Sequence, residues 1–154
     1  MPGYRVISIS PDLSDKVRNS GRTPGYGHPT HTETASAFGP CRQCLAGFAE
    51  GEERRILFTF DPFFGLEDLP LPGPVFIHER TCPSYAEDAG FPEQLKHLPL
   101  TLNAYSRGRR LIDQVYVSDG DPEPAIGHLF AEDAVDYIYV RNTEAGCYIC
   151  RLER

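Results

Sequence analysis

Two Cys-x-x-Cys pairs constrain the fold of this 154-residue chain more than any other feature of its sequence. Cys41 and Cys44 form the first pair, and Cys147 and Cys150 form the second pair near the other end of the sequence. Four thiolates in two such pairs are a common ligand set for tetrahedral zinc. If one ion held all four sulfur atoms, two segments far apart in the sequence would have to meet at one point.

The second pair argues against a single four-cysteine site. The residues from Cys147 to Leu152 are mostly β-forming, and no turn residue separates the two cysteines. In a regular strand, positions i and i+3 point to opposite faces. We therefore expect Cys147 and Cys150 to diverge, with Tyr148, Cys150 and Leu152 on one face and Cys150 acting as a small core residue. Zinc bound by Cys41, Cys44, Cys147 and Cys150 remains an alternative interpretation.

The first pair allows other interpretations, because Cys41 and Cys44 follow Pro40 without a clear strand or helix pattern. His28 and His31 precede the pair, and two imidazoles with two thiolates would make a local zinc site. A redox pair is a further alternative, but it requires a helix N-terminus directly after a strand. No strand–helix–strand pattern surrounds the pair, so the sequence leaves the cofactor open, with zinc as one alternative.

A thiol-dependent enzyme is another alternative. His78 and Cys82 lie close together in the sequence, with Glu79 and Arg80 between them. Thiol chemistry requires a base near the sulfur atom and a donor for the developing oxyanion. In this interpretation Cys82 or Cys147 is the nucleophile and His78 is the base. Sequence neighbours do not always face one another, so whether the chain is an enzyme stays open.

The charge and hydropathy of the chain exclude several classes of partner. Its net charge of −7 repels phosphate backbones, so we expect no nucleic-acid binding. No apolar run approaches the ~20 residues of a membrane helix, so we expect no membrane partner. The first residues, from Met1 to Ser8, lack the basic and apolar segments of a secretion signal. We therefore expect a cytoplasmic protein whose thiols stay reduced.

Apolar runs predict a strand-rich protein with two short helices. Strands are expected at residues 4–10, 54–60, 75–78, 101–105, 111–117, 137–141 and 147–152, and helices at 91–98 and after Asp121. Because the 54–60 run is apolar on both faces, it is expected to be a covered, central strand. The sum predicts an α+β fold with a mostly antiparallel, strongly curled sheet.

The segment from Ser14 to Pro40 has few apolar residues and is rich in Gly, Pro, Ser and Thr. Such a long stretch without regular structure is uncommon in a small domain. We interpret residues 1–40 as an N-terminal strand and a polar arm, and residues 41–154 as the main α+β domain, within one structural domain. The arm is one reason to expect a homodimer, in which it would pack on a second copy of the chain.

Several motifs, taken in order, resemble those of the small bacterial family catalogued as domain of unknown function 1203. They are Pro40-Cys41-Arg42, the 54–60 strand, the run from Gly73 to His78, the run from Leu111 to Asp121, Leu129-Phe130-Ala131 and the segment from Val140 to Arg151. The resemblance implies a stand-alone domain without an established activity. It also implies a shared site at Cys41, Arg42, Arg141, Asn142 and Cys147, and that Cys44 and Cys150 are present in only part of the family.

The sequence as a whole favours a small binding or interaction module. Arg42, Arg141 and Asn142 are the expected ligand-binding residues, because a guanidinium group binds carboxylate or phosphate with two parallel hydrogen bonds. We expect the pocket where the segment after Pro40 meets the final hairpin, with a small anionic ligand as the partner. A zinc-binding module and a thiol-dependent enzyme are the two alternatives.

Overall fold

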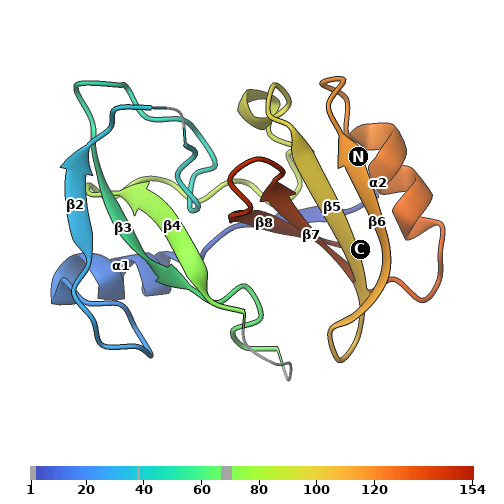
Figure 1. Ribbon diagram of the computed structural model, residues 1–154, viewed down its shortest axis with the longest axis horizontal. Helices are drawn as coiled ribbons and strands as arrows, with labels where there is room; N and C mark the ends of the chain where they lie inside the picture. Colours follow the sequence, from blue (N-terminus) through green and yellow to red (C-terminus); the bar gives the residue numbers. More distant parts are fainter. Residues whose placement is uncertain (1–2, 38, 67–70) are drawn as a thin grey trace.

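The β-rich runs form strands, but these strands divide between two sheets. The computed structural model describes residues 3–37, 39–66 and 71–154. A five-stranded sheet and a three-stranded sheet lie side by side, and every strand pair in them is antiparallel (Figure 1). The expected α+β fold with mostly antiparallel strands is confirmed. The expected strongly curled sheet is wrong, because the strands build two open sheets, each with its own apolar cluster.

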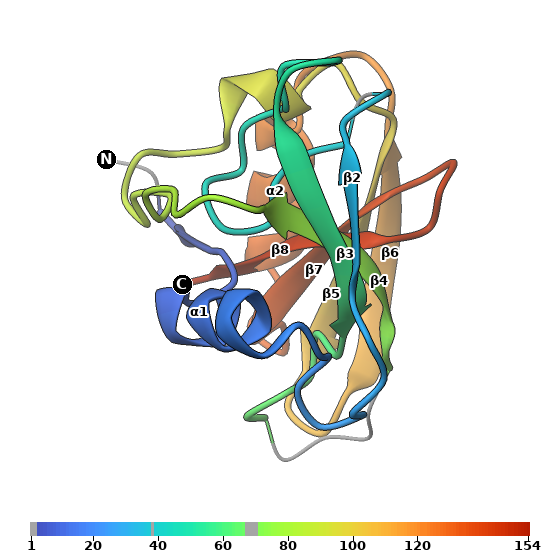
Figure 2. The same ribbon diagram turned by 90° about the vertical axis from the view of Figure 1, so that its left-hand side faces the viewer.

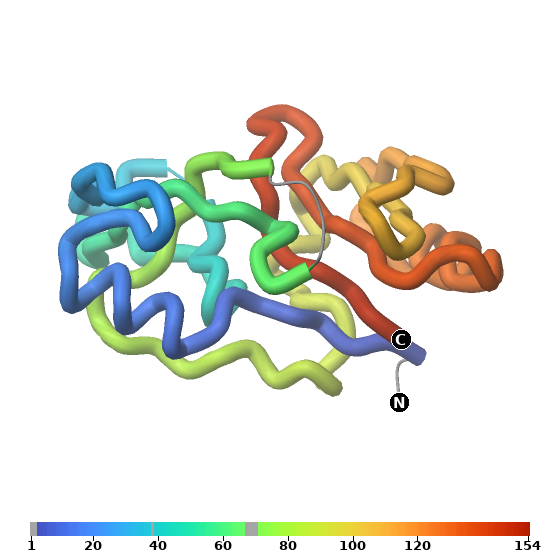
Figure 3. The backbone as a smooth tube through the Cα atoms, turned by 90° about the horizontal axis from the view of Figure 1, so that it is seen from below, coloured from blue at the N-terminus to red at the C-terminus, as the bar shows by residue number. Residues whose placement is uncertain are grey.

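The five-stranded sheet has the order β1–β8–β7–β5–β6. Its strands are β1 (Arg5–Ile7), β5 (Leu100–Ser106), β6 (Arg110–Val117), β7 (Tyr137–Asn142) and β8 (Tyr148–Glu153). Pairing of β1 with β8 places the first and last strands of the chain next to each other, as Figure 3 shows. Strands β5 and β6 form one hairpin and β7 and β8 form another, and the connection between the two hairpins holds α2 (Glu123–Phe130). Local sequence patterns therefore suffice to predict most of this sheet.

The two faces of this sheet carry different residues. Leu102 and Ala104 of β5, with Ile138 and Val140 of β7, point to one face and form an apolar core with α2. The alternate residues point to the other face, because successive side chains in a strand alternate. That second face carries a cluster of buried tyrosines around Phe63, formed by Tyr105, Tyr137, Tyr139 and Tyr148.

A bulge in the final hairpin changes which residues share a face. Val140 pairs with Cys150, whereas the next residue of β7, Arg141, pairs with Tyr148. Ile149 is therefore the additional residue, and a bulge of this kind reverses the alternation of side chains. Tyr148 lies on the tyrosine face, while Cys150 lies in the apolar core. The expectation that Tyr148 and Cys150 share a face is wrong for this reason.

The smaller sheet has β3 (Arg54–Phe60) at its centre, between β2 (His31–Thr34) and β4 (Gly73–His78). Its central position agrees with the apolar character of both faces of β3. Ile56, Phe58, Val75 and Ile77 form most of its apolar cluster.

Helix α1 (Pro11–Ser20) packs on this sheet, on one side of it in Figures 1 and 2. Ser10 caps the helix, since its Oγ accepts a hydrogen bond from the Leu13 backbone N–H at 3.2 Å. Gly21 ends the helix with φ 63°, a conformation that glycine adopts without strain. Val17 is fully buried in the same apolar cluster as β3 and β4. Part of the segment interpreted as a polar arm is therefore regular structure, because it contains most of α1 and all of β2. Phe38 lies outside the described residues.

The helix expected at residues 91–98 is only a short 3-10 turn at Glu93–Leu95. Pro92 precedes it without a side-chain cap, and Pro99 follows within a few residues, so little room remains for an α-helix. The helix expected after Asp121 forms as α2. None of the helices among the described residues is both long enough and apolar enough to cross a membrane.

Candidate metal centre

Three cysteines and one histidine meet beside the smaller sheet. One ligand atom from each of Cys41, Cys44, His78 and Cys82 lies within 4.8 Å of all the others. Cys41 is buried and the other three are partly buried. His78 is the last residue of β4, and Cys82 follows in the next loop, while the two other cysteines come from a turn that precedes β3. The smaller sheet and its flanking loops thus supply all four groups.

The turn that holds the first two cysteines is fixed by backbone hydrogen bonds. The Leu45 N–H donates to the Cys41 carbonyl at 2.8 Å, and the Cys41 N–H donates to the Ala46 carbonyl at 2.8 Å. Leu45 has φ 58°, a left-handed conformation that is uncommon for leucine and closes the turn. The His78 backbone N–H also lies 3.4 Å from Cys41 Sγ, as a donor to that sulfur. A tight turn of this type presents both sulfur atoms to one side, as zinc-binding Cys-x-x-Cys pairs require.

Two distances in the cluster match the edges of a zinc tetrahedron. Zinc–sulfur bonds of about 2.3 Å and zinc–nitrogen bonds of about 2.0 Å at tetrahedral angles give a sulfur–sulfur edge of about 3.8 Å and a sulfur–nitrogen edge of about 3.5 Å. Cys41 Sγ lies 3.7 Å from Cys82 Sγ. Cys44 Sγ lies 3.5 Å from His78 Nδ1. A disulfide requires sulfur atoms about 2.05 Å apart, and all five cysteines are free.

Glu53 orients the imidazole from the outside. Its Oε2 lies 2.6 Å from His78 Nε2, the ring nitrogen that does not face the sulfur atoms. This carboxylate oxygen is buried, and among the described residues its contact with His78 is an ion pair without a hydrogen bond. The Phe48 ring packs on the imidazole, with 4.5 Å between ring centroids. A carboxylate on the far nitrogen of a metal-ligating histidine is the usual outer partner, because it fixes the tautomer and the ring orientation.

Arg18 brings a positive charge from α1 to the cysteine side of the cluster. Its side chain is only 9% exposed. Its Nε donates to the His78 carbonyl at 3.1 Å, and its Nη2 lies 3.8 Å from Cys82 Sγ. The Gln43 amide also holds this loop, since its Nε2 donates to the Cys82 carbonyl at 2.7 Å. If the cluster held a divalent cation, three thiolates would leave one net negative charge beside this guanidinium group, which also pairs with Asp15 Oδ1 at 3.1 Å.

The pKa shifts within the cluster favour negative charge on one sulfur atom. The hydrogen bond between Cys44 and Cys41 lowers the pKa of the Cys41 thiol and raises the pKa of Cys44. The hydrogen bond to Cys41 raises the pKa of His78 to about 10. These shifts favour negative charge on Cys41, and a cation bound there would displace the protons held by Cys44 and His78.

The second Cys-x-x-Cys pair does not belong to this cluster, whose members among the described residues are Cys41, Cys44, His78 and Cys82. Cys150 is fully buried in the core of the larger sheet, and burial raises its pKa to about 12. Cys147 lines a cavity beside Arg141 on the tyrosine face. The two sulfur atoms thus point to different surroundings, which agrees with the expected divergence.

The two histidines near the first pair also lie elsewhere. The His28 ring bonds to Thr59 Oγ1 at 2.9 Å and to the Pro29 carbonyl at 3.0 Å. His31 is exposed and lies 3.6 Å from a carboxylate oxygen of Glu33. Neither belongs to the group of ligands around Cys41.

The three expected anion-binding residues have different environments. Arg42 is 2% exposed, and its guanidinium group donates to the backbone carbonyls of Tyr148 and Pro40. Its role is therefore to hold these two backbone segments together. The Asn142 Oδ1 accepts hydrogen bonds from the backbone of the following turn. Arg141 lines the cavity on the tyrosine face, and neither Arg42 nor Asn142 is among the described residues that line it.

Each of the four clustered residues stood out in the sequence, but in different hypotheses. The His-x-x-x-Cys spacing of His78 and Cys82 suits a pair of zinc ligands, and together with Cys41 and Cys44 it is the signal that would have identified the set. No sequence signal pointed to Arg18 or Glu53, because both reach the site only through tertiary packing.

The fold and the site define a two-sheet α+β protein with a Cys3His cluster. The chain belongs to the family described as protein of unknown function (DUF1203), whose family model matches residues 39–154. All four clustered residues lie within the matched part. No curated protein and no solved structure matches the chain.

Proposed function

We propose that this chain is a zinc-binding module in which Cys41, Cys44, His78 and Cys82 hold one structural Zn²⁺. The observation that carries the proposal is the agreement of the 3.7 Å and 3.5 Å distances with the edges of a zinc tetrahedron. Three thiolates and one imidazole form a common structural zinc set, and soft sulfur ligands disfavour magnesium and calcium.

A structural role fits better than a catalytic one. Four protein ligands fill the tetrahedral shell, whereas a catalytic zinc keeps one position for water or substrate. The ion would join the turn at Cys41, the end of β4 and the loop at Cys82, which α1 covers through Arg18. Because such a site forms only when these segments come together, the free energy of metal binding would add to the stability of the smaller sheet. A reducing compartment such as the cytoplasm would keep the thiols available.

The thiol-dependent enzyme is the second candidate, since His78 lies beside the same sulfur atoms. In that case one thiol would be a fast nucleophile, and the purified protein would react with an alkylating reagent without prior removal of metal. The other nucleophile candidate, Cys147, lines a cavity that His78 does not line.

Metal analysis of the purified protein tests the proposal. We expect one zinc per chain, and Cys44→Ser or Cys82→Ser should lose most of it. Cys147→Ser is the matched control, because it removes a partly buried thiol outside the cluster and should keep full zinc content. Wild-type protein without zinc after growth in zinc-supplemented medium, or equal loss in all three variants, would refute the site.

A further inference from the structure

A cavity separate from the cysteine cluster opens on the tyrosine face of the larger sheet. Its volume is about 540 Å³, which is within the usual size range of small-molecule sites. The ends of β3 and β4 form one wall, and β5, β6, β7 and the final turn form the other. The residues that line it include Phe60, Asn103, Gln114, Tyr139, Arg141 and Tyr148.

Arg141 is held in place in this cavity by a chain of side-chain hydrogen bonds. Its Nε donates to Asn103 Oδ1 at 2.9 Å. The Asn103 amide in turn donates to Gln114 Oε1, and the Gln114 amide donates to Tyr116 OH at 2.7 Å. These contacts use only the Nε of the guanidinium group. In the described part of the chain, no acceptor bonds to its two terminal nitrogens and no carboxylate forms an ion pair with it.

The remaining walls are apolar and aromatic. The Tyr139 and Tyr148 rings are 5.0 Å apart at 61°, and the Phe60 ring is 5.3 Å from Tyr148. Burial raises the pKa of Tyr139 to about 12, so this phenol stays neutral at physiological pH. The rings therefore offer an apolar, uncharged surface beside a positioned cation.

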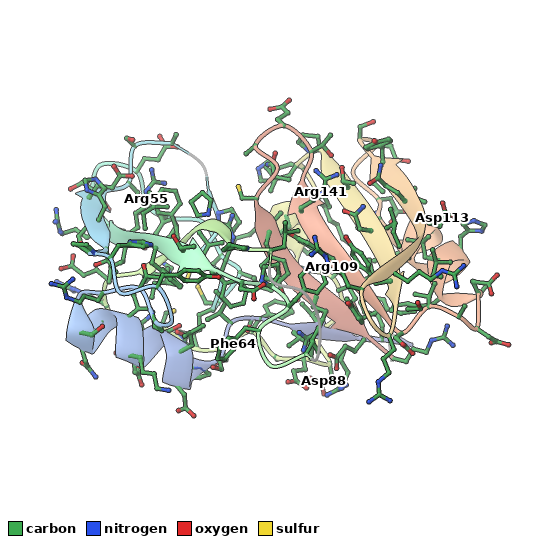
Figure 4. The ribbon with its side chains drawn as sticks, turned by 60° about the horizontal axis from the view of Figure 1, so that its bottom comes forward. Arg55, Phe64, Asp88, Arg109, Asp113 and Arg141 are labelled. Carbon is green, nitrogen blue, oxygen red and sulfur yellow. The ribbon has the colours of Figure 1, made fainter. Side chains whose placement is uncertain are left out.

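The charge of the cavity is opposite to that of the protein. The chain carries a net charge of −7, yet no described residue that lines the cavity is acidic. Figure 4 shows Arg141 and Arg109 over the middle of the larger sheet, with Asp113 further out on β6. Asp113 pairs with Ala104, whose side chain is in the core on the other face, so its carboxylate belongs to the opposite side of the sheet. A positioned guanidinium whose terminal nitrogens bond to no described residue selects for negative charge in an aromatic cavity.

We propose that this cavity binds a small organic anion. Its carboxylate, sulfonate or phosphate group accepts two hydrogen bonds from the terminal nitrogens of Arg141, and its apolar body packs against Tyr139, Tyr148 and Phe60. This inference does not depend on the zinc site.

Two fluorescent probes with the same rings test this inference. The anion 8-anilino-1-naphthalenesulfonate and its neutral analogue N-phenyl-1-naphthylamine differ by the sulfonate group. We expect wild-type protein to bind the sulfonate at one site, about 10-fold to 100-fold more tightly than Arg141→Gln does, because one charge-assisted pair is lost. The affinity for the neutral probe should be the same in both proteins, which also reports that the variant is folded.

Further variants separate charge from geometry. Arg141→Lys keeps the positive charge but not the two-pronged donor, so its affinity for the sulfonate should be intermediate. Arg54→Gln is the matched control, because it removes a half-exposed arginine at the start of β3, whereas Phe60 is at the end of that strand. This variant should bind both probes as wild type does. Absence of saturable sulfonate binding, or equal weakening of both probes in Arg141→Gln and Arg141→Lys, would overturn the proposal. Unchanged sulfonate affinity in Arg141→Gln would overturn it too.

Discussion

Glu53 Oε2 lies 2.6 Å from His78 Nε2, on the side of the imidazole that faces away from the sulfur atoms. This relationship predicts that Glu53→Gln lowers zinc affinity by about 10-fold to 100-fold while the stoichiometry stays at one ion per chain. Competition with a chromophoric chelator measures the affinity. Glu52→Gln is the control, since Glu52 is an exposed neighbour, and a loss of affinity as large as that of Glu53→Gln would contradict the predicted role of Glu53.

Arg18 links α1 to the cluster, so its replacement should lower the stability of the folded protein. Arg18→Met retains much of the apolar stem but loses the hydrogen bonds to the His78 carbonyl and to Cys82 Sγ. It also loses the contacts with Gln43 Oε1 and Asp15 Oδ1. We expect the free energy of unfolding of the zinc-loaded protein to fall by about 1–3 kcal/mol in a urea titration. Lys16→Met on the exposed side of α1 should change it by less than about 0.5 kcal/mol. If both variants lost the same amount, the contact with the cluster would contribute nothing.

Removal of zinc should loosen one half of the molecule before the other. The smaller sheet and α1 share an apolar cluster next to the four ligands, whereas the larger sheet has its own core. Hydrogen exchange after chelation should therefore accelerate in α1, β3 and β4 and remain slow in β5 and β7. A uniform loss of protection over all strands would show that the two sheets unfold together and would contradict this prediction.

The reactivity of Cys150 should depend on pH in a way that the fold dictates. Its pKa is raised to about 12 by burial, above the ordinary value for a thiol. At pH 8 its thiolate fraction is then about 10⁻⁴, compared with about 0.2 for a thiol of pKa 8.5. We expect native alkylation at pH 8, followed by mass spectrometry, to leave Cys150 unmodified and to modify the partly buried Cys147 first. If Cys150 were modified as fast as Cys147, the Cys150 sulfur atom would have to lie outside the core, which would contradict this prediction.

The strands could be predicted from the sequence because their signals are local. The runs at β3, β5, β6 and β7 are rich in β-forming residues, and the hairpins join neighbours in sequence. The division into two sheets could not be predicted, because it depends on which apolar faces pack together. The bulge at Ile149 was also not predictable, since it follows from the register between β7 and β8.

Helix α1 was missed because its sequence is mostly polar. Only Leu13 and Val17 mark an apolar stripe, although Ser10, Pro11 and Gly21 are good signals for its start and end. The candidate site could be predicted only in part, because it depends on contacts between segments that are distant in sequence. The ligand types were evident, but the contact between the Cys41 turn and the end of β4 joins segments that are far apart in sequence, and spacing alone could not select it over Cys147 and Cys150.

X-ray absorption at the zinc edge of the purified protein tests the central claim most directly. A Cys3His site predicts three sulfur neighbours at about 2.3 Å and one nitrogen neighbour at about 2.0 Å, with the outer-shell scattering of an imidazole ring. Replacement of His78 by Ala should remove that imidazole scattering. A first shell of four sulfur atoms, or no zinc at all in the wild-type protein, would contradict the account.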